Sequence, residues 1–202
     1  MKDFIFIIGP SAVGKTTLAK GLFEYYEGVY IEQNMVPEFS IPKTCEDVGV
    51  YEEKVCWENT LMQIEYFRQL GYKNIIALDF DDLRTGEIPK VFKGTDFITL
   101  KLISSNPEQI KRQMQKRHDE GEGLYDLEHV EVLNKYIRQR ALLPNEVEVD
   151  VCRKSEEEVL KQAIYIIDNY TSVINYDYEL PEKELFNSWV KSNGLKRDDE
   201  EA

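Results

Sequence analysis

The stretch IIGPSAVGKTTL, from Ile7 to Leu18, decides the fold of this chain. It contains the pattern Gly9-x-x-x-x-Gly14-Lys15-Thr16, with an apolar run before it and a helical pattern after it. Glycines let the backbone wrap around a phosphate chain with several N–H groups directed inward, and the helix that follows adds the positive end of its dipole. The sequence therefore predicts a phosphate-binding loop between a buried strand and a helix.

The side chains of this loop have expected roles. Lys15 is expected to place its charge on the β- and γ-phosphates, and the Thr16 hydroxyl is expected to ligate Mg²⁺. Thr17 is one position further and is expected to donate to another phosphate oxygen. The loop part of the predicted nucleotide site is therefore Gly9, Ser11, Ala12, Val13, Gly14, Lys15, Thr16 and Thr17.

Apolar runs elsewhere in the chain alternate with helical patterns. Strands are expected at 3–8, 29–31, 74–78, 97–103 and 147–151, and helices at 15–26, 52–70, from 107, at 126–142 and at 155–170. The helix over 52–70 is indicated by Val55, Met62, Tyr66 and Leu70, which recur near helical spacing. Strands that alternate with helices predict an α/β fold of three layers, in which a five-stranded parallel sheet is covered by helices on both faces.

We expect one domain over 1–180, because strands from both ends of the chain contribute to one sheet. Within it, 118–125 reads as an exposed loop. Residues 181–202 are expected to form a last helix and a disordered acidic tail.

Composition and charge exclude several classes of protein. The formal net charge is −13, and such a surface repels a nucleic-acid backbone, so no nucleic-acid partner is expected. The longest early apolar run has five residues, too few for a membrane span or an export signal. The three cysteines are scattered and form no metal-binding or disulfide pattern, so we expect a cytoplasmic protein without a membrane partner. The sequence does not indicate an oligomeric state.

With the loop, the order of strands and the arginine-bearing helix pair from Gln109 to Arg140, the chain resembles the nucleoside monophosphate kinase-like group of P-loop kinases over about residues 3–170. Within that group, GPSAVGKTTL and PEQIKRQMQKR are most similar to guanylate kinases. The resemblance implies a P-loop kinase domain over 1–180 with five parallel strands, ATP as the donor and Mg²⁺. It also implies an acceptor lobe over 33–73 and a lid over 109–140 that closes over the nucleotide. The acceptor motifs of guanylate and adenylate kinases are not matched, since EQNMVPEFSIPKT and LDFDDLR stand in their places.

Carboxylates follow two of the expected strands. Asp79 comes directly after the apolar run NIIAL, where it would hold Mg²⁺ through a bound water, and Asp81 and Asp82 follow it. Glu32 ends the second strand, near the crevice that ligands occupy in open α/β sheets. Because phosphoryl transfer needs a metal and a group that orients the attacking oxygen, Asp79 and Glu32 are the expected catalytic acids.

Positive charge over the transferring phosphoryl group is expected from the helix pair. In the resembled group such arginines clamp the phosphoryl group, which here implies Arg117 first and Arg138 second, with Arg112 near the nucleotide and Arg140 as a further candidate. The expected catalytic set is therefore Lys15, Asp79, Glu32, Arg117 and Arg138.

The acceptor lobe is poor in arginine. Between Gln33 and Lys73 there are one arginine, three lysines and seven acidic residues. A second phosphate is normally held by several guanidinium groups, so this composition favours an unphosphorylated hydroxyl on a nucleoside, sugar or similar molecule. The lobe also holds six aromatic residues, expected mostly in the core, of which one or two could stack on a planar ring: Phe39, Tyr51, Trp57, Tyr66, Phe67 and Tyr72.

Two other functions stay open on the sequence. One is a nucleoside monophosphate kinase of the guanylate kinase type. The other is an ATP- or GTP-binding switch without a dedicated acceptor, although the sequence shows no separate effector domain.

Overall fold

The computed structural model describes residues 1–45, 48–80, 82–119 and 134–180. Five parallel strands form one sheet in the order β2-β3-β1-β4-β5. The strands are β1 (Phe4–Ile8), β2 (Val29–Glu32), β3 (Ile75–Leu78), β4 (Phe97–Ile103) and β5 (Glu146–Asp150). The predicted parallel sheet is confirmed, and each strand lies within one residue of its expected position.

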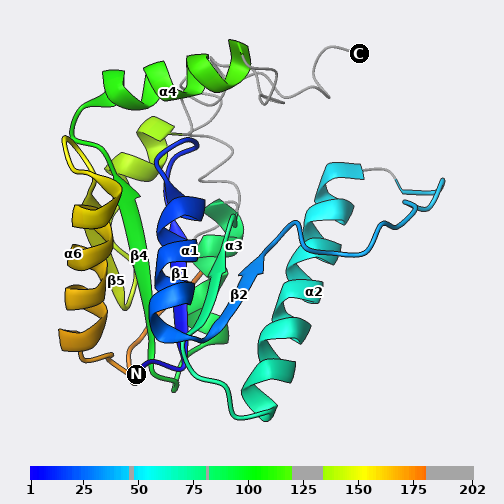
Figure 1. Ribbon diagram of the computed structural model, residues 1–202. Helices are drawn as coiled ribbons and strands as arrows, with labels where there is room; N and C mark the ends of the chain where they lie inside the picture. The colour runs from blue at the N-terminus through cyan, green and yellow to red at the C-terminus, as the bar shows by residue number, and fades with distance from the viewer. Residues whose placement is uncertain (46–47, 81, 120–133, 181–202) are drawn as a thin grey trace.

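Helices cover both faces of the sheet (Figure 1). They are α1 (Lys15–Tyr26), α2 (Val48–Gln69), α3 (Asp82–Val91), α4 (Pro107–Asp119) and α6 (Glu156–Asn169), and residues 134–139 are also helical. Alternate residues of β1 point to opposite faces. Ile5 and Ile7 pack with α1 and α6, whereas Phe4 and Phe6 pack with α2 and α3. The predicted three-layer α/β fold is confirmed.

Helix α2 presents a different face to the core from the one its apolar spacing indicates. Met62, Tyr66 and Leu70 are between 57% and 64% exposed, whereas Trp57 and Ile64 are buried against the sheet. The expectation that the lobe's aromatic residues are mostly core is also wrong, because Phe39, Tyr66 and Tyr72 are exposed and only Trp57 of the six is buried. The helix begins at Val48, four residues before its expected start.

The sequence pattern does not predict α3. Gly86 and Pro89 both lower helix propensity, and Pro89 lies inside the helix. Burial of Ile88 and Phe92 against Phe4 and Phe6 supplies the stabilisation, with ring centroids of Phe6 and Phe92 4.7 Å apart. Tertiary packing therefore overrides local propensity in this segment.

Several expectations lie outside the described residues. They are the exposed loop beyond Asp119, the helix over 126–142 before residue 134, Asp81, and the C-terminal helix and tail over 181–202. In the parts of the chain that the structure describes, no helix combines the length and apolar character needed to cross a membrane.

The chain after α6, residues 170–178, forms a segment that we call the C-terminal strap. At its beginning the ammonium of Lys2, which is 5% exposed, donates to the carbonyl of Tyr170 at 2.7 Å. At its end the Tyr178 hydroxyl donates to the carbonyl of Gly86 in α3 at 2.8 Å. The strap therefore connects the N-terminal end of the chain to α3.

Candidate active site

The loop between β1 and α1 has the backbone geometry of an anion cradle. Gly9 has φ +143°, and a Cβ added to it would lie 2.4 Å from the carbonyl oxygen of Leu102, so only glycine fits. Gly14 also has a positive φ, +98°, and it precedes the first turn of α1, which carries no acidic residue. The positive end of the α1 dipole is thus left open to an anion.

The Lys15 ammonium lies inside this loop. Its Nζ donates to the carbonyl oxygens of Gly9 at 3.2 Å and Pro10 at 3.1 Å, and it lies 3.7 Å from Oδ1 of Asp79. Burial and the charge of Arg117 lower the pKa of Lys15 below its ordinary value, against the opposing effect of Asp79. Lys15 therefore holds its charge inside the glycine loop, beside the carboxylate of Asp79.

Asp79 follows the last residue of β3 and has an unusual backbone. Its φ is +68°, a left-handed conformation that costs a non-glycine residue about 1–3 kcal/mol. In this conformation its carboxylate lies beside Lys15, directly after the end of β3. Thr16, the other predicted metal-binding residue, is half-buried at the start of α1.

This pair of residues suits magnesium better than metals that need a full protein cage. Mg²⁺ is commonly bound through one or two protein oxygens, waters and substrate phosphates. The described residues contain no cluster of three or more His, Cys, Asp or Glu that could hold a metal by themselves. Thr16 and Asp79 supply the one or two protein oxygens that such a magnesium site needs.

Glu32 lies on the strand next to Asp79. It is the last residue of β2 and pairs in register with Leu78, the residue before Asp79. The Tyr30 hydroxyl donates a hydrogen bond to Oε1 of Glu32. Burial, this bond and the charges of Glu32 and Asp79 raise the pKa of Tyr30 above its ordinary value. Tyr30 therefore orients Glu32, and the sequence offers no sign of that role beyond the alternation of β2.

A pocket of about 410 Å³ lies beside the cradle. Figure 1 shows α4 crossing the carboxyl edge of the sheet near the loop after β1. The pocket is enclosed by Ala12 to Gly14, by the Arg117 side of α4 and by the start of α6. Arg112 is exposed and does not line it. The full lining is Ala12, Val13, Gly14, Thr17, Gln109, Gln113, Lys116, Arg117, Val151, Lys154, Glu156 and Val159.

The helical stretch 134–139 contacts the cradle at one point. The side-chain oxygen of Asn134 accepts a hydrogen bond from the backbone N–H of Ser11 at 3.1 Å. Arg138 is half-buried one helical turn after Asn134 and so lies on the same side of this stretch. Arg140 instead binds Glu146 through both terminal nitrogens at 2.7 Å, which assigns it to the support of β5.

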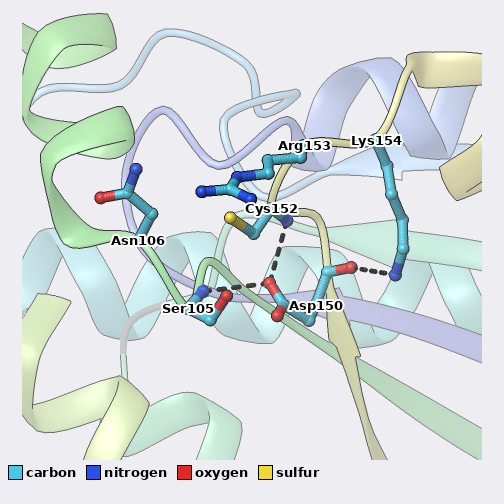
Figure 2. A pocket seen from close by; sticks show the side chains of 6 residues that line it. All are labelled: Ser105, Asn106, Asp150, Cys152, Arg153 and Lys154. Atoms are coloured by element: carbon cyan, nitrogen blue, oxygen red, sulfur yellow. Dashed lines mark hydrogen bonds between the residues drawn. The ribbon is translucent and has the colours of Figure 1, made fainter.

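A second pocket of about 420 Å³ adjoins the first and shares Lys154 with it (Figure 2). Its Asp150 accepts hydrogen bonds from the N–H groups of Ser105 at 3.0 Å and Cys152 at 2.9 Å. Although burial opposes it, these N–H groups lower the pKa of Asp150. Figure 2 shows the side chain of Arg153 extending toward Asn106. These residues extend the cleft from the cradle toward the ends of β4 and β5.

A polar cluster on the other side of Asp79 was not indicated by any sequence motif. The amide nitrogen of Gln33 donates to Glu53 of α2 at 2.7 Å, and Nε1 of Trp57 donates to Glu87 of α3 at 2.8 Å. Arg84 pairs with the same Glu87. The bonded residues are 20 and 30 positions apart in the chain, so these contacts depend on how α2 and α3 pack. A short sequence pattern cannot predict them.

Solved structures with a similar fold include several kinases. No protein-family model and no curated protein sequence matches the chain. A sugar kinase from Janibacter sp. HTCC2649 has a TM-score of 0.55 and 18% identity, with 83% of this chain and 95% of that chain covered. A gluconokinase from Sinorhizobium meliloti 1021 has a TM-score of 0.53 and 14% identity, with 83% and 92% covered.

The YorR protein from Bacillus subtilis, solved in complex with phosphorylated GDP, has a TM-score of 0.51 and 17% identity, with 82% of this chain and 95% of that chain covered. At these identities the likeness concerns the fold alone. The similarity to guanylate kinases in particular stays a prediction. What the comparisons establish is that this chain has the α/β fold that these small-molecule kinases share.

Proposed function

We propose that the protein is an ATP-dependent phosphotransferase that moves the γ-phosphate of MgATP to a hydroxyl group of a small molecule. The observation that carries the proposal is the cradle itself, in which Lys15 lies within 3.2 Å of two loop carbonyls and 3.7 Å from Asp79. The kinase fold of the solved structures supports it.

The donor is proposed to bind along the cradle and the adjoining pocket. Loop N–H groups and the N-terminus of α1 would hold the phosphates, with Lys15 on the β- and γ-phosphates. The rest of the nucleotide would extend past α4, where Arg117 and Lys154 line the pocket. Arg117 is close enough to Lys15 to affect its pKa, so its charge is felt where the phosphoryl group would transfer. Arg138 stays a weaker candidate for the same role.

Magnesium would be held by the Thr16 hydroxyl and, through a water, by Asp79. Bound there, the metal would neutralise charge on the phosphate oxygens. The remaining requirement is a group that orients the attacking hydroxyl, and Glu32, fixed by Tyr30 on the neighbouring strand end, fits it.

The proposed reaction is an in-line displacement. The acceptor oxygen forms a bond to the γ-phosphorus, while the bond from that phosphorus to the β,γ-bridging oxygen breaks and ADP leaves with the electron pair. The hydroxyl proton passes to the Glu32 carboxylate. Lys15 and Arg117 stabilise the charge on the phosphoryl oxygens during this step.

The cations of the proposed acceptor lobe, 33–73, support a neutral acceptor. Three of its four cations, Lys54, Arg68 and Lys73, form ion pairs with Glu58, Glu65 and Asp3 on exposed parts of the surface. These three charges are already paired, and with one arginine in the lobe a second phosphate would meet few guanidinium groups.

The test is a product assay on the purified full chain. MgATP is offered with nucleosides, sugars and nucleoside monophosphates, and phosphorylated product and ADP are both quantified against a no-acceptor control. We expect product from a neutral hydroxyl compound. Product from a monophosphate would identify a nucleoside monophosphate kinase, acceptor-independent hydrolysis would favour a nucleotide switch, and failure to bind any triphosphate would overturn the proposal.

A further inference from the structure

We propose that Gln33 determines acceptor specificity: its side-chain oxygen accepts a hydrogen bond from a hydroxyl or N–H group of a neutral, polyhydroxylated acceptor. This inference rests on the proposed phosphotransferase function. It adds the residue that recognises the acceptor and the chemical class that this residue selects.

Gln33 is fixed at the edge of the sheet where the proposed chemistry takes place. It directly follows Glu32, and its backbone N–H donates to the carbonyl of Leu78 at 3.1 Å, which extends the β2–β3 ladder by one bond. Leu78 precedes Asp79. The backbone of Gln33 is therefore held at the end of β2, directly after the proposed base and paired with the residue before the proposed metal-binding carboxylate.

The amide of Gln33 has a defined orientation. Its nitrogen donates to Oε2 of Glu53 at 2.7 Å, and because an ionised carboxylate only accepts hydrogen bonds, the nitrogen must be the atom on that side. The amide oxygen is therefore turned away from Glu53. The hydrogen bond to Glu53 of α2 thus determines that the amide oxygen is the end that faces away from this helix.

The oxygen so presented has no hydrogen-bond partner among the described residues. Gln33 is only 6% exposed, and its Oε1 is fully buried. A buried polar atom without a partner is unfavourable, and such atoms are rare in folded proteins. Because Oε1 is closed to solvent in this structure, the side chains around it must shift for an acceptor to reach it, and a hydrogen-bond donor of the acceptor would then satisfy this oxygen.

The surrounding charge selects against an anionic acceptor. Three carboxylates lie near Gln33 in the chain or in the fold. Glu32 precedes it, and Glu53 accepts the hydrogen bond from its amide. Glu87 accepts a hydrogen bond from Trp57, which lies one turn after Glu53 on α2. Arg84 is paired with Glu87, so that cation is balanced within the cluster. A phosphate group would face carboxylates here, whereas hydroxyl and N–H donors would meet acceptors. Donor-rich neutral molecules such as nucleosides and hexoses fit this environment.

The first arm of the experiment uses the full wild-type chain with MgATP. Thymidine, adenosine, glucose and ribose are each compared with their monophosphates, and the best neutral acceptor is then compared with analogues that each lack one non-reacting hydroxyl. We expect one analogue to lose about tenfold to 100-fold in kcat/KM, as sites built to bond a hydroxyl do. Preference for a monophosphate, or equal use of every analogue, would overturn the inference.

The second arm uses Gln33→Met, which keeps the length of the side chain but removes the amide. We expect kcat/KM for the parent acceptor to fall by about the same factor, and the discrimination against the critical analogue to disappear, while KM for MgATP is unchanged. Gln63→Met is the matched control, because Gln63 is an α2 glutamine bonded to Asn59 and the carbonyl of Met35. Discrimination that survives in Gln33→Met would contradict the role of Gln33.

Different results would contradict the proposed phosphotransferase function and the role of Gln33. If MgADP binds by calorimetry but neither neutral compounds nor monophosphates are phosphorylated, the proposed function fails and the inference fails with it. If a compound is phosphorylated and Gln33 does not affect the choice among analogues, only the inference fails. Thermal unfolding and MgADP affinity of Gln33→Met show whether the variant is folded, and the analogue series on the wild type tests the inference in either case.

Discussion

The two sides of the candidate site differ in whether backbone groups or side chains form them. The proposed donor side is mainly backbone, because Gly9 and Gly14 shape a loop of consecutive residues and α1 begins directly after it. The proposed acceptor side consists of side chains that follow β2 or belong to α2 and α3, such as Gln33, Glu53 and Glu87, and that meet only in the folded protein. A backbone site leaves a motif in the sequence, whereas a side-chain site leaves almost none.

The strongest test of this comparison is the cation inside the cradle. Lys15→Ala should reduce transfer by about 10³-fold, because no other group replaces its charge on the phosphates. Thermal unfolding should be nearly unchanged, since the ammonium acts on the loop and not on the core. Lys20→Ala, on the exposed side of the same helix, is the control and should keep full turnover. Undiminished transfer in Lys15→Ala would refute the donor site.

The carboxylate between the two sides should give the next largest effect. Asp79→Asn is expected to lower kcat/KM by about 10²-fold, because the amide cannot balance Lys15 or hold a metal-bound water. Asparagine tolerates the left-handed backbone at φ +68°, so stability should be kept, whereas Asp79→Ala should lose stability as well. Steady-state kinetics reports the effect of the lost charge, and urea unfolding reports the effect on backbone strain. Full activity of Asp79→Asn would show that this carboxylate has no part in the mechanism.

Two glycines of the cradle sharpen the claim that the donor side is a backbone structure. Gly9→Ala should lower the free energy of unfolding by about 3 kcal/mol, because its Cβ would meet the Leu102 carbonyl at 2.4 Å and its φ is +143°. Gly14→Ala has open space around its Cβ and should lose about 1 kcal/mol from its φ of +98° alone. Equal losses in denaturant titrations would show that the clash with β4 does not constrain the loop.

A substitution on the proposed acceptor side should have a smaller effect than Gly9→Ala. Trp57→Phe keeps an aromatic ring near Phe80, now 5.4 Å away, but loses the hydrogen bond to Glu87. We expect the free energy of unfolding to fall by about 1–2 kcal/mol. Affinity for MgADP, measured by calorimetry, should not change. A change in nucleotide affinity would mean that the two sides are coupled through α2 and α3.

The sequence predicts the sheet and the cradle because their signals are local. Five apolar runs and one glycine pattern indicate the strand positions and the loop. The pairing of β2 with β3, which brings Glu32 to the strand next to Asp79, is seen only in the structure. The site roles of these residues, and of Arg112, Arg117 and Arg138, stay predictions until they are tested.

Features that depend on tertiary packing were harder to predict. Helix α3 is stabilised by Phe92 and Ile88 against the sheet although Gly86 and Pro89 oppose it. On α2, an exposed row that includes Met62 and Tyr66 has the same spacing as a buried face, so periodicity alone selected the wrong side. The bond from Tyr30 to Glu32 and the buried oxygen of Gln33 depend on side-chain directions that no spacing rule specifies.

The C-terminal strap has a consequence for the order in which the molecule is completed during synthesis. The residues of the glycine loop precede α3 in the chain, whereas Tyr178, which bonds the carbonyl of Gly86, is made 92 residues after that glycine. Domains generally form as their segments emerge. A nascent chain would thus possess its glycine loop well before α3 receives the bond from Tyr178, so the α3 side of the fold is completed later than the loop.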